Sequence, residues 1–296
     1  MTKPSSIRRS RVYKPLLFLA PAIIVYGFVM VYPMAFSFML SLIPTSGLNI
    51  EWKGFGLENY RTLLFNDPVF WESLKNNGIW MGLALLIPMS LGLLVAQVLN
   101  RDFKGRIVFR ALYYYPAILS LTATGLIWVW MYNPQLGLLN SFLKSLGVKG
   151  TVSWLGNMQI ALFSVFAADV WMSIGFAMVL FLGGMQGIPN ELYEAAVVEG
   201  ANKRQSFFRI TIPLLRESFI VISVLYMIGS MKIFDIIFAM TLGGPGRSTY
   251  VLGVYMYFNA FKFFKLGMGS AVSWIMVILV AIIVIPYVNF MSRDTK

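Results

Sequence analysis

The sequence IPNELYEAAVVEGANKRQSFFRITIPLL occupies residues 188–215 of this 296-residue chain. It is a polar, charged and small-residue segment between two apolar runs, each long enough to cross a membrane as a helix. A proline and an asparagine near its start favour a helix beginning, and the acidic residues that follow suit the positive end of a helix dipole. We therefore expect a folded loop at a membrane surface, with a short helix over Glu191–Glu199, a turn at Gly200 and an amphipathic helix over Asn202–Ile212.

The side chains that this segment presents leave two interpretations open. Its first half offers two carboxylates and two small residues, Glu191, Glu194, Ala195 and Ala196, and its second half is basic and aromatic. One interpretation is a connector on the membrane surface, with its aromatic side chains buried and its charged side chains in water. The other is a docking element for a soluble partner protein.

The composition of the whole chain is that of a membrane protein. Hydrophobic residues make up 58% of it and charged residues 12%, whereas a soluble domain carries about 25% charged residues. The chain has no histidine and no cysteine, which excludes disulfides, thiolate and imidazole metal sites, and the commonest general base. No pair of carboxylates has the setting of an acid–base catalyst. We therefore expect no catalytic residue and no metal site.

Six apolar runs predict an all-α, polytopic membrane protein with six transmembrane helices, because about 20 apolar residues cross the hydrocarbon core. The expected spans are Pro15–Leu42, Gly78–Leu99, Ile107–Met131, Gln159–Met185, Ser218–Met240 and Gly267–Phe290. The proline at position 116 predicts a kink in the third span. Residues 1–14 are expected to form a cytoplasmic N-terminal segment and residues 15–296 the membrane domain. The first run is too long for a signal peptide and lacks a polar cleavage region, so we expect an uncleaved helix.

The net charge of +12 orients the protein and does not indicate a nucleic-acid partner. With the N-terminus inside, 15 lysines and arginines fall on the inner side of the membrane and 8 on the outer side. This bias follows the positive-inside rule and predicts both termini in the cytoplasm. The outer segment Trp52–Asn77 is rich in aromatic residues, which is typical of a belt at the membrane interface.

The 188–215 segment resembles the EAA motif, which marks the membrane subunits of binding-protein-dependent ABC importers. That motif reads E-A-A, three residues, G, nine residues, I-x-L-P. The matching positions here are Glu194-Ala195-Ala196, Gly200, Ile210 and Pro213, and the one departure is Ile212 where leucine is usual. Three further stretches are similar to carbohydrate importer subunits of the maltose and glycerol-phosphate type: Gly56-Leu57-Glu58-Asn59-Tyr60, Gly243-Gly244-Pro245 and Gly269-Ser270-Ala271.

This resemblance implies a type I ABC importer permease fold in the cytoplasmic (inner) membrane of a bacterium or archaeon. In that family the EAA loop, here residues 188–215, forms coupling helices that sit in a cleft of the ATPase subunit. The residues that would couple to the ATPase are Glu191, Glu194, Ala195, Ala196 and Gly200. The implied partners are a second homologous permease subunit, two ATPase subunits, an extracytoplasmic solute-binding protein and a carbohydrate substrate, besides membrane lipid. This chain has no G-x-x-x-x-G-K-[ST] phosphate loop, so ATP and Mg²⁺ would be bound by the partner ATPase, and we expect no cofactor in this chain.

Polar groups inside predicted spans are costly and are candidates for a solute site. Sugar sites combine aromatic faces with polar groups that bind hydroxyls, and by alignment these positions resemble the sugar-contacting ones of maltose-type subunits. The candidates are Asp169, Trp171, Met172, Ser173 and Phe176 in the fourth span, and Tyr226, Ser230, Lys232, Ile233 and Asp235 in the fifth. Two alternatives remain open. Lys232 and Asp235, three residues apart, could pair on one helix face, and Asp169 could cap a neighbouring helix.

Other functions are also open at this point. A permease of the same class for a non-sugar solute, such as glycerol-phosphate or a polyol, would share these features. An ion-coupled secondary transporter would use Asp169 or Asp235 to carry protons, but it has no need of an EAA loop. A membrane enzyme is disfavoured because the chain lacks histidine and cysteine.

Overall fold

The computed structural model of the chain describes residues 18–44 and 54–292. Within these residues the secondary structure is entirely helical, which confirms the predicted all-α class. The predicted N-terminal segment 1–14 and the start of the first predicted span lie outside the described residues. The chain divides into two compact units, one of residues up to 66 with 256–274 and one of residues 67–255 with 275 onwards.

The first unit contains the N-terminal helix Phe18–Ser41. This helix includes a π-helical segment, η1 (Gly27–Val31), followed by α2 (Tyr32–Ser41). The other elements of the unit are α3 (Glu58–Arg61), η2 (Thr62–Asn66), η4 (Phe258–Lys262) and the start of α15 (Leu266–Ser292). Asn59 is buried, and its Nδ2 donates to the carbonyls of Ser41 and Ile43, both at 2.9 Å. Because the last carbonyls of a helix have no partner within it, this amide caps the C-terminal end of α2.

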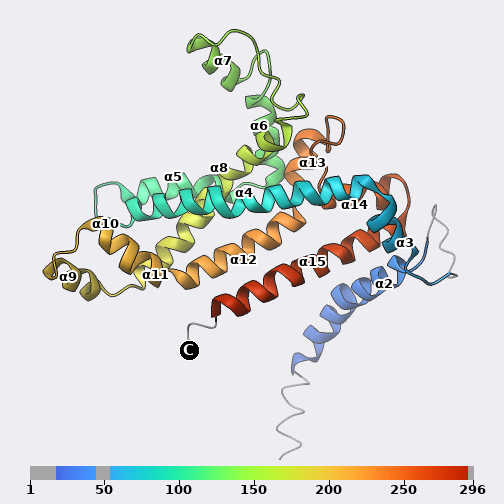
Figure 1. Cartoon of the computed structure of the whole chain (residues 1–296), viewed down its shortest axis with the longest axis horizontal. Helices are drawn as coiled ribbons and strands as arrows, with labels where there is room; N and C mark the ends of the chain where they lie inside the picture. The colour runs from blue at the N-terminus through green and yellow to red at the C-terminus, as the bar shows by residue number, and fades with distance from the viewer. Residues whose placement is uncertain (1–17, 45–53, 293–296) are drawn as a thin grey trace, which may run out of the picture. The chain divides into compact units, whose positions relative to one another are not determined.

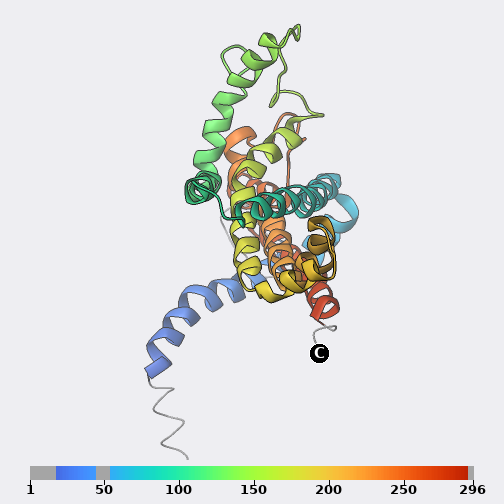
Figure 2. The same ribbon diagram turned by 90° about the vertical axis from the view of Figure 1, so that its left-hand side faces the viewer.

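The second unit holds most of the chain (Figure 1). Its elements are α4 (Pro68–Leu99), α5 (Arg106–Ile118), α6 (Leu121–Met131), α7 (Leu138–Ser145), α8 (Ala161–Gln186), α9 (Asn190–Val198), α10 (Lys203–Ser206), η3 (Phe207–Thr211), α11 (Ile212–Leu214), α12 (Arg216–Lys232), α13 (Asp235–Thr241), α14 (Leu252–Tyr257) and the remainder of α15. In both views the α7 segment lies away from α4, α8 and α12 (Figures 1 and 2).

The core of the second unit lies where α4, α8 and α12 pack together. Its buried residues are Leu93, Ala96 and Leu99 of α4, Ala177, Met178, Phe181, Leu182 and Met185 of α8, and Ile188, Leu215 and Ile222. α4 and α8 approach closely at Gly92, where a Cβ atom would lie 2.5 Å from the Cβ of Ala177. Two helices can approach this closely only when one of them carries no side chain at the contact.

Among residues 18–44 and 54–292, four helices are long and apolar enough to cross a membrane on their own: Phe18–Ser41, Pro68–Leu99, Ala161–Gln186 and Leu266–Met291. Two bent helix pairs raise the number to six if each pair is one span. They are Arg106–Ile118 with Leu121–Met131, bent by 99°, and Lys203–Leu214 with Arg216–Lys232, bent by 63°. The six predicted spans therefore correspond to helices in the structure, but several of their bounds and their continuity differ.

The second predicted span begins ten residues earlier than expected, at Pro68 instead of Gly78. Asp67 caps this helix, because its Oδ1 accepts hydrogen bonds from the backbone N–H groups of Val69 and Phe70, at 2.9 and 3.3 Å. An aspartate followed by proline is a helix-start signal, which the apolar-run criterion did not use.

The third predicted span is not continuous. It breaks at Leu119 and Ser120, three residues past the expected kink position, and α5 and α6 meet at 99°. The Ser120 hydroxyl accepts from the N–H of Ala123 at 3.2 Å and so starts α6 as an N-cap. The expectation of one helix over Ile107–Met131 was therefore wrong, and the reason is a local cap that supports a new helix.

Candidate functional site

A cavity of about 390 Å³ opens between α4, α8, α12 and α13. Its volume lies in the range of small-molecule sites, roughly 300–1,000 Å³. Most of the predicted solute residues line it: Asp169, Ser173, Tyr226, Ser230, Lys232, Ile233 and Asp235. The structure therefore brings together, around one space, residues from two predicted spans.

Asp169 is the most buried charged group of this wall, at 9% exposure. Its Oδ2 accepts a hydrogen bond from the Ser173 hydroxyl at 3.2 Å, across one turn of α8, so the contact that it makes is within its own helix. The hydroxyl of Tyr226, on α12, donates to the backbone carbonyl of Ser173 at 2.9 Å and so ties α12 to α8 at the cavity. This wall offers carboxylate and hydroxyl oxygens, the groups that bind hydroxyl-rich solutes.

Lys232 and Asp235 lie on either side of a helix break. α12 ends at Lys232 and α13 begins at Asp235, and between them Ile233 has φ −58° and ψ 126° while Phe234 has φ −148° and ψ −58°. Both charged side chains are exposed and line the cavity, and within the described part of the chain no ion pair joins them. The alternative that they pair on one helix face was wrong, because that pairing needs a continuous helix. The helix of the predicted fifth span, Ser218–Met240, is interrupted at this point.

Three of the predicted solute residues face elsewhere. Met172 accepts a hydrogen bond on its sulfur from Thr124 of α6, at 3.7 Å. Trp171 lines a different pocket beside α5, and its ring lies edge-on to that of Trp128 at 6.1 Å. The Phe176 ring lies 6.5 Å from that of Tyr226 and does not line the cavity.

Two adjacent asparagines of α4 bond backbone groups of later segments, and Asn77 reaches the last turn of α12 beside the helix break. Neither was among the predicted site residues. Asn77 is fully buried; its Nδ2 donates to the carbonyl of Ser230 at 2.7 Å, and its Oδ1 accepts from the N–H of Leu252 at 2.7 Å. Asn76 donates to the carbonyls of Ser248 and Tyr250, at 3.1 and 2.7 Å. Both asparagines precede the predicted start of the second span at Gly78, so they were placed outside the membrane. With the observed helix bounds they are polar residues inside an apolar helix, which would have marked them as candidate site residues.

Trp80, also on α4, is a further cavity residue that the sequence analysis missed. Its ring packs edge-on against Phe166 of α8 with the centroids 5.1 Å apart, and it is almost fully buried. With the predicted span starting at Gly78, Trp80 lay near its end, where tryptophan is expected in an interface belt. Only the observed start of α4 at Pro68 places it well inside the helix.

The 188–215 loop folds as two helices, as predicted. The first is α9, Asn190–Val198, and the second is the continuous helix Lys203–Leu214, which contains α10, η3 and α11. Gly200, at φ +83°, ends the first helix: its N–H donates to the carbonyl of Val197 at 3.0 Å, and the N–H of Ala201 donates to that of Ala196 at 2.8 Å. This is the Schellman pattern, which requires a left-handed residue at this position.

A reciprocal pair of hydrogen bonds starts the second helix. The Asn202 side chain accepts from the N–H of Gln205 at 2.9 Å, and the Gln205 side chain accepts from the N–H of Asn202 at 2.8 Å. This capping box satisfies two N–H groups that the helix itself cannot bond. The local sequence thus fixes the turn between the two helices.

One face of α9 is left uncovered. Glu191, Glu194, Ala195, Val197 and Val198 are exposed, with Val198 at 89%. The opposite face is anchored: the Tyr193 hydroxyl lies 2.9 Å from that of Thr211, and Tyr193 and Phe207 pack against the core of α4, α8 and α12. The loop is thus packed against the helices α4, α8 and α12. Figure 1 shows α9 and α10 at the opposite end of α12 from α13.

Residues 88–293 match the family described as "Binding-protein-dependent transport system inner membrane component". The chain is 37% identical to the sulfoquinovosyl glycerol transport system permease protein SmoG of Agrobacterium fabrum, over 88% of this chain and 84% of that protein. It is 35% identical to the trehalose/maltose transport system permease protein MalF of Thermococcus litoralis, over 92% of each chain.

Among solved structures, a chain of a bacterial ABC transporter involved in the import of the acidic polysaccharide alginate superposes with a TM-score of 0.85. It is 23% identical, and the match covers 97% of this chain and 98% of that one. At this identity the likeness shows a shared fold, which is that of an ABC importer permease. Together with the family match and the relatives above, these findings establish that the chain belongs to the binding-protein-dependent transport system inner membrane components, the permease subunits of ABC importers.

Proposed function

We propose that the chain forms one half of the translocation pathway of an ATP-driven importer for a sugar or oligosaccharide. The observation that carries this proposal is the 390 Å³ cavity, whose wall combines the Trp80 and Tyr226 rings with the oxygens of Asp169, Ser173 and Ser230. Aromatic faces lie against the C–H surface of a sugar ring, and the oxygens bind its hydroxyls. The names of the SmoG and MalF relatives support the carbohydrate class.

The loop 188–215 would transmit the work of ATP hydrolysis to this cavity. Its small side chains at Ala195 and Ala196 would let an ATPase subunit approach closely, and Glu191 and Glu194 would meet basic groups on that partner. Gly200 keeps the two helices at their fixed turn. ATP and Mg²⁺ would be held by the ATPase, and Tyr193 and Phe207 would pass its movement to α4, α8 and α12.

The proposed assembly pairs this chain with a second homologous permease subunit, two ATPase subunits and an extracytoplasmic solute-binding protein. Both termini would lie in the cytoplasm, which puts the basic loop around 101–110 and the 188–215 loop on the ATPase side. A complex of the related alginate transporter with an alginate pentasaccharide-bound periplasmic protein supports the place given to the binding protein.

A matched pair of serine substitutions on α8 tests the cavity. Ser173 lines it, whereas Ser164 is buried elsewhere on the same helix. In the assembled importer, supplied with a panel of radiolabelled mono- and oligosaccharides, Ser173→Ala should raise the KM for the transported sugar about threefold to tenfold, the worth of one hydrogen bond. Asp169→Asn should raise it by about tenfold or more, because hydrogen bonds to a charged group are stronger.

Ser164→Ala should leave the KM unchanged. Equal effects of the two serine substitutions would remove the cavity from the solute pathway. Uptake that survives inactivation of the ATPase but collapses with the proton gradient would replace the proposed function by secondary transport.

A further inference from the structure

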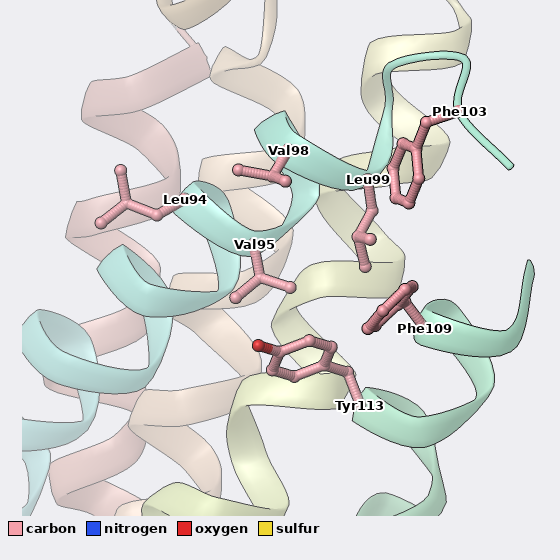
Figure 3. A pocket seen from close by; sticks show the side chains of 7 residues that line it. All are labelled: Leu94, Val95, Val98, Leu99, Phe103, Phe109 and Tyr113. Atoms are coloured by element: carbon pink, nitrogen blue, oxygen red, sulfur yellow. The ribbon is translucent and has the colours of Figure 1, made fainter. Parts of the chain in front are cut away.

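A second cavity, separate from the solute cavity, lies between the end of α4 and the start of α5. It measures about 420 Å³ and is lined by Leu94, Val95, Val98, Leu99, Phe103, Phe109 and Tyr113. Figure 3 shows the rings of Phe109 and Tyr113 pointing from α5 towards Val95 and Leu99 of α4. Apart from the Tyr113 hydroxyl, every lining side chain is apolar.

This cavity continues along α5 as a groove. A neighbouring pocket of about 370 Å³ shares Phe109 and Tyr113 with it and extends to Pro116 and Trp171. On α5 the lining of the groove runs from Phe109 to Pro116, which is about 10 Å at 1.5 Å per residue. One leaflet of the hydrocarbon core is about 15 Å deep, so the groove can hold a large part of one acyl chain.

The groove is open, and its apolar lining needs cover. Val98 is 56% exposed and Phe109 is 47% exposed. Contiguous exposed apolar surface of this kind marks a site for lipid or another protein. The apolar lining fits a lipid and another protein equally well, whereas the charged residues at one end of the groove favour a lipid.

The end of the groove next to the α4–α5 loop carries uncompensated positive charge. This loop and the first turns of α5 hold four basic residues and one acidic residue, Asp102, which pairs with Arg106. Arg110 donates from its Nη2 to the carbonyl of Leu99, a groove residue, at 2.8 Å, while its buried Nε has no protein partner among the described residues. Lys104 is exposed and directly follows Phe103, another groove residue.

We propose that this groove binds one anionic phospholipid of the cytoplasmic leaflet, with an acyl chain along α5 and the phosphate held by Lys104 and Arg110. An apolar groove with cations at its cytoplasmic end is the pattern that recognises acidic lipid headgroups. A purely apolar helix of another subunit would fill the groove but would not neutralise these cations. The site uses the orientation proposed above and none of the residues that line the solute cavity.

The test measures lipid retention by the assembled importer. The complex is purified in detergent with equal amounts of dioleoyl phosphatidylglycerol and dioleoyl phosphatidylcholine, and native mass spectrometry counts the lipids that stay bound. We expect one phosphatidylglycerol to be retained in preference to phosphatidylcholine. Lys104→Glu changes the local charge by two units, and at roughly fivefold per unit charge this should weaken that retention about 25-fold. Val98→Trp should abolish it by filling the groove.

Two controls match these variants. Lys149→Glu makes the same charge change on an exposed lysine of another loop, and Leu86→Trp places the same bulk at an exposed position of α4 outside the groove. Retention by the groove variants equal to that of their controls would overturn the proposal. So would loss of the second permease from the Val98→Trp complex with lipid retention unchanged, because the groove would then be a subunit interface. The readout is binding, so it does not depend on which solute is transported.

Discussion

Replacing Asn77 by leucine should both destabilise the protein and weaken solute binding. Leucine has nearly the same shape but forms no hydrogen bond. The substitution therefore leaves the carbonyl of Ser230 and the N–H of Leu252 without the partner that now lies 2.7 Å from each. Both groups belong to helix ends, the last turn of α12 and the first turn of α14, so neither has an alternative within its own helix.

The magnitude follows from the number of groups left unsatisfied. Each buried backbone group without a partner costs about 1–3 kcal/mol, which gives a range of about 2–6 kcal/mol for the two. Hydrogen bonds within membrane proteins measure at the low end of such ranges, so we expect a loss of about 2 kcal/mol. For a protein of this size that lowers the apparent Tm by about 4–8 °C.

The assay compares Asn77→Leu with Asn140→Leu in the assembled importer. Asn140 is also buried, and its amide bonds the backbone of Pro134 and Val152 in the α7 segment, away from the helix break. Both variants should lower the Tm. Only Asn77→Leu should raise the KM for the solute, by severalfold, because the residues at the released break, Ile233 and Phe234, line the cavity.

The reasoning would be refuted if Asn77→Leu left both the Tm and the KM at their wild-type values. It would also fail if both asparagine variants raised the KM alike, since the effect would then be a general consequence of lost stability.

Two glycine substitutions give further predictions. Gly92→Ala would place a Cβ 2.5 Å from that of Ala177, and because overpacking of this kind costs about 1–3 kcal/mol, the Tm of the variant should fall. Gly82→Ala, on the same helix, has open space around the new Cβ and should keep the wild-type Tm. Equal Tm values for the two variants would contradict the close α4–α8 contact. Gly200→Ala puts a side chain at φ +83°, which costs about 1–2 kcal/mol, so ATP-driven uptake should fall in a complex that still assembles. Gly183→Ala, whose new Cβ meets no neighbour within 4 Å, should transport at the wild-type rate. Unchanged uptake by the Gly200→Ala complex would count against a fixed turn in the loop.

The sequence predicted the features that depend on neighbouring residues. The all-α class follows from the length of the apolar runs, and the two loop helices follow from Gly200 and from the residues that favour a helix start. The bend in the third span was predicted from its proline, although as a kink three residues too early, whereas the α12–α13 break was not predicted, because an apolar run has the same composition whether or not it bends. At the α12–α13 break, the last turn of α12 is bonded by Asn77, which lies 153 residues away in the chain, and no local pattern contains this contact.

The cavity was predicted in part, for a reason of helix geometry. Asp169 and Ser173 are four residues apart and share one face of α8, and both line the cavity. Trp171, two residues from Asp169, points about 200° around the helix, since each residue turns it by about 100°. All three were predicted as solute residues from their side-chain chemistry. Their angular positions around α8 decide which of them face the cavity.

Crosslinking can show whether the 188–215 loop docks an ATPase. The chain has no natural cysteine, so a single Ala195→Cys on the exposed face of α9 is a unique attachment point, with Lys149→Cys on another loop as the control. In the assembled importer we predict that Ala195→Cys crosslinks to the ATPase subunit with a yield that changes when ATP is added, and that Lys149→Cys does not crosslink. No crosslink from Ala195→Cys, in a complex shown to contain the ATPase, would contradict the account and leave the loop as a connector on the membrane surface.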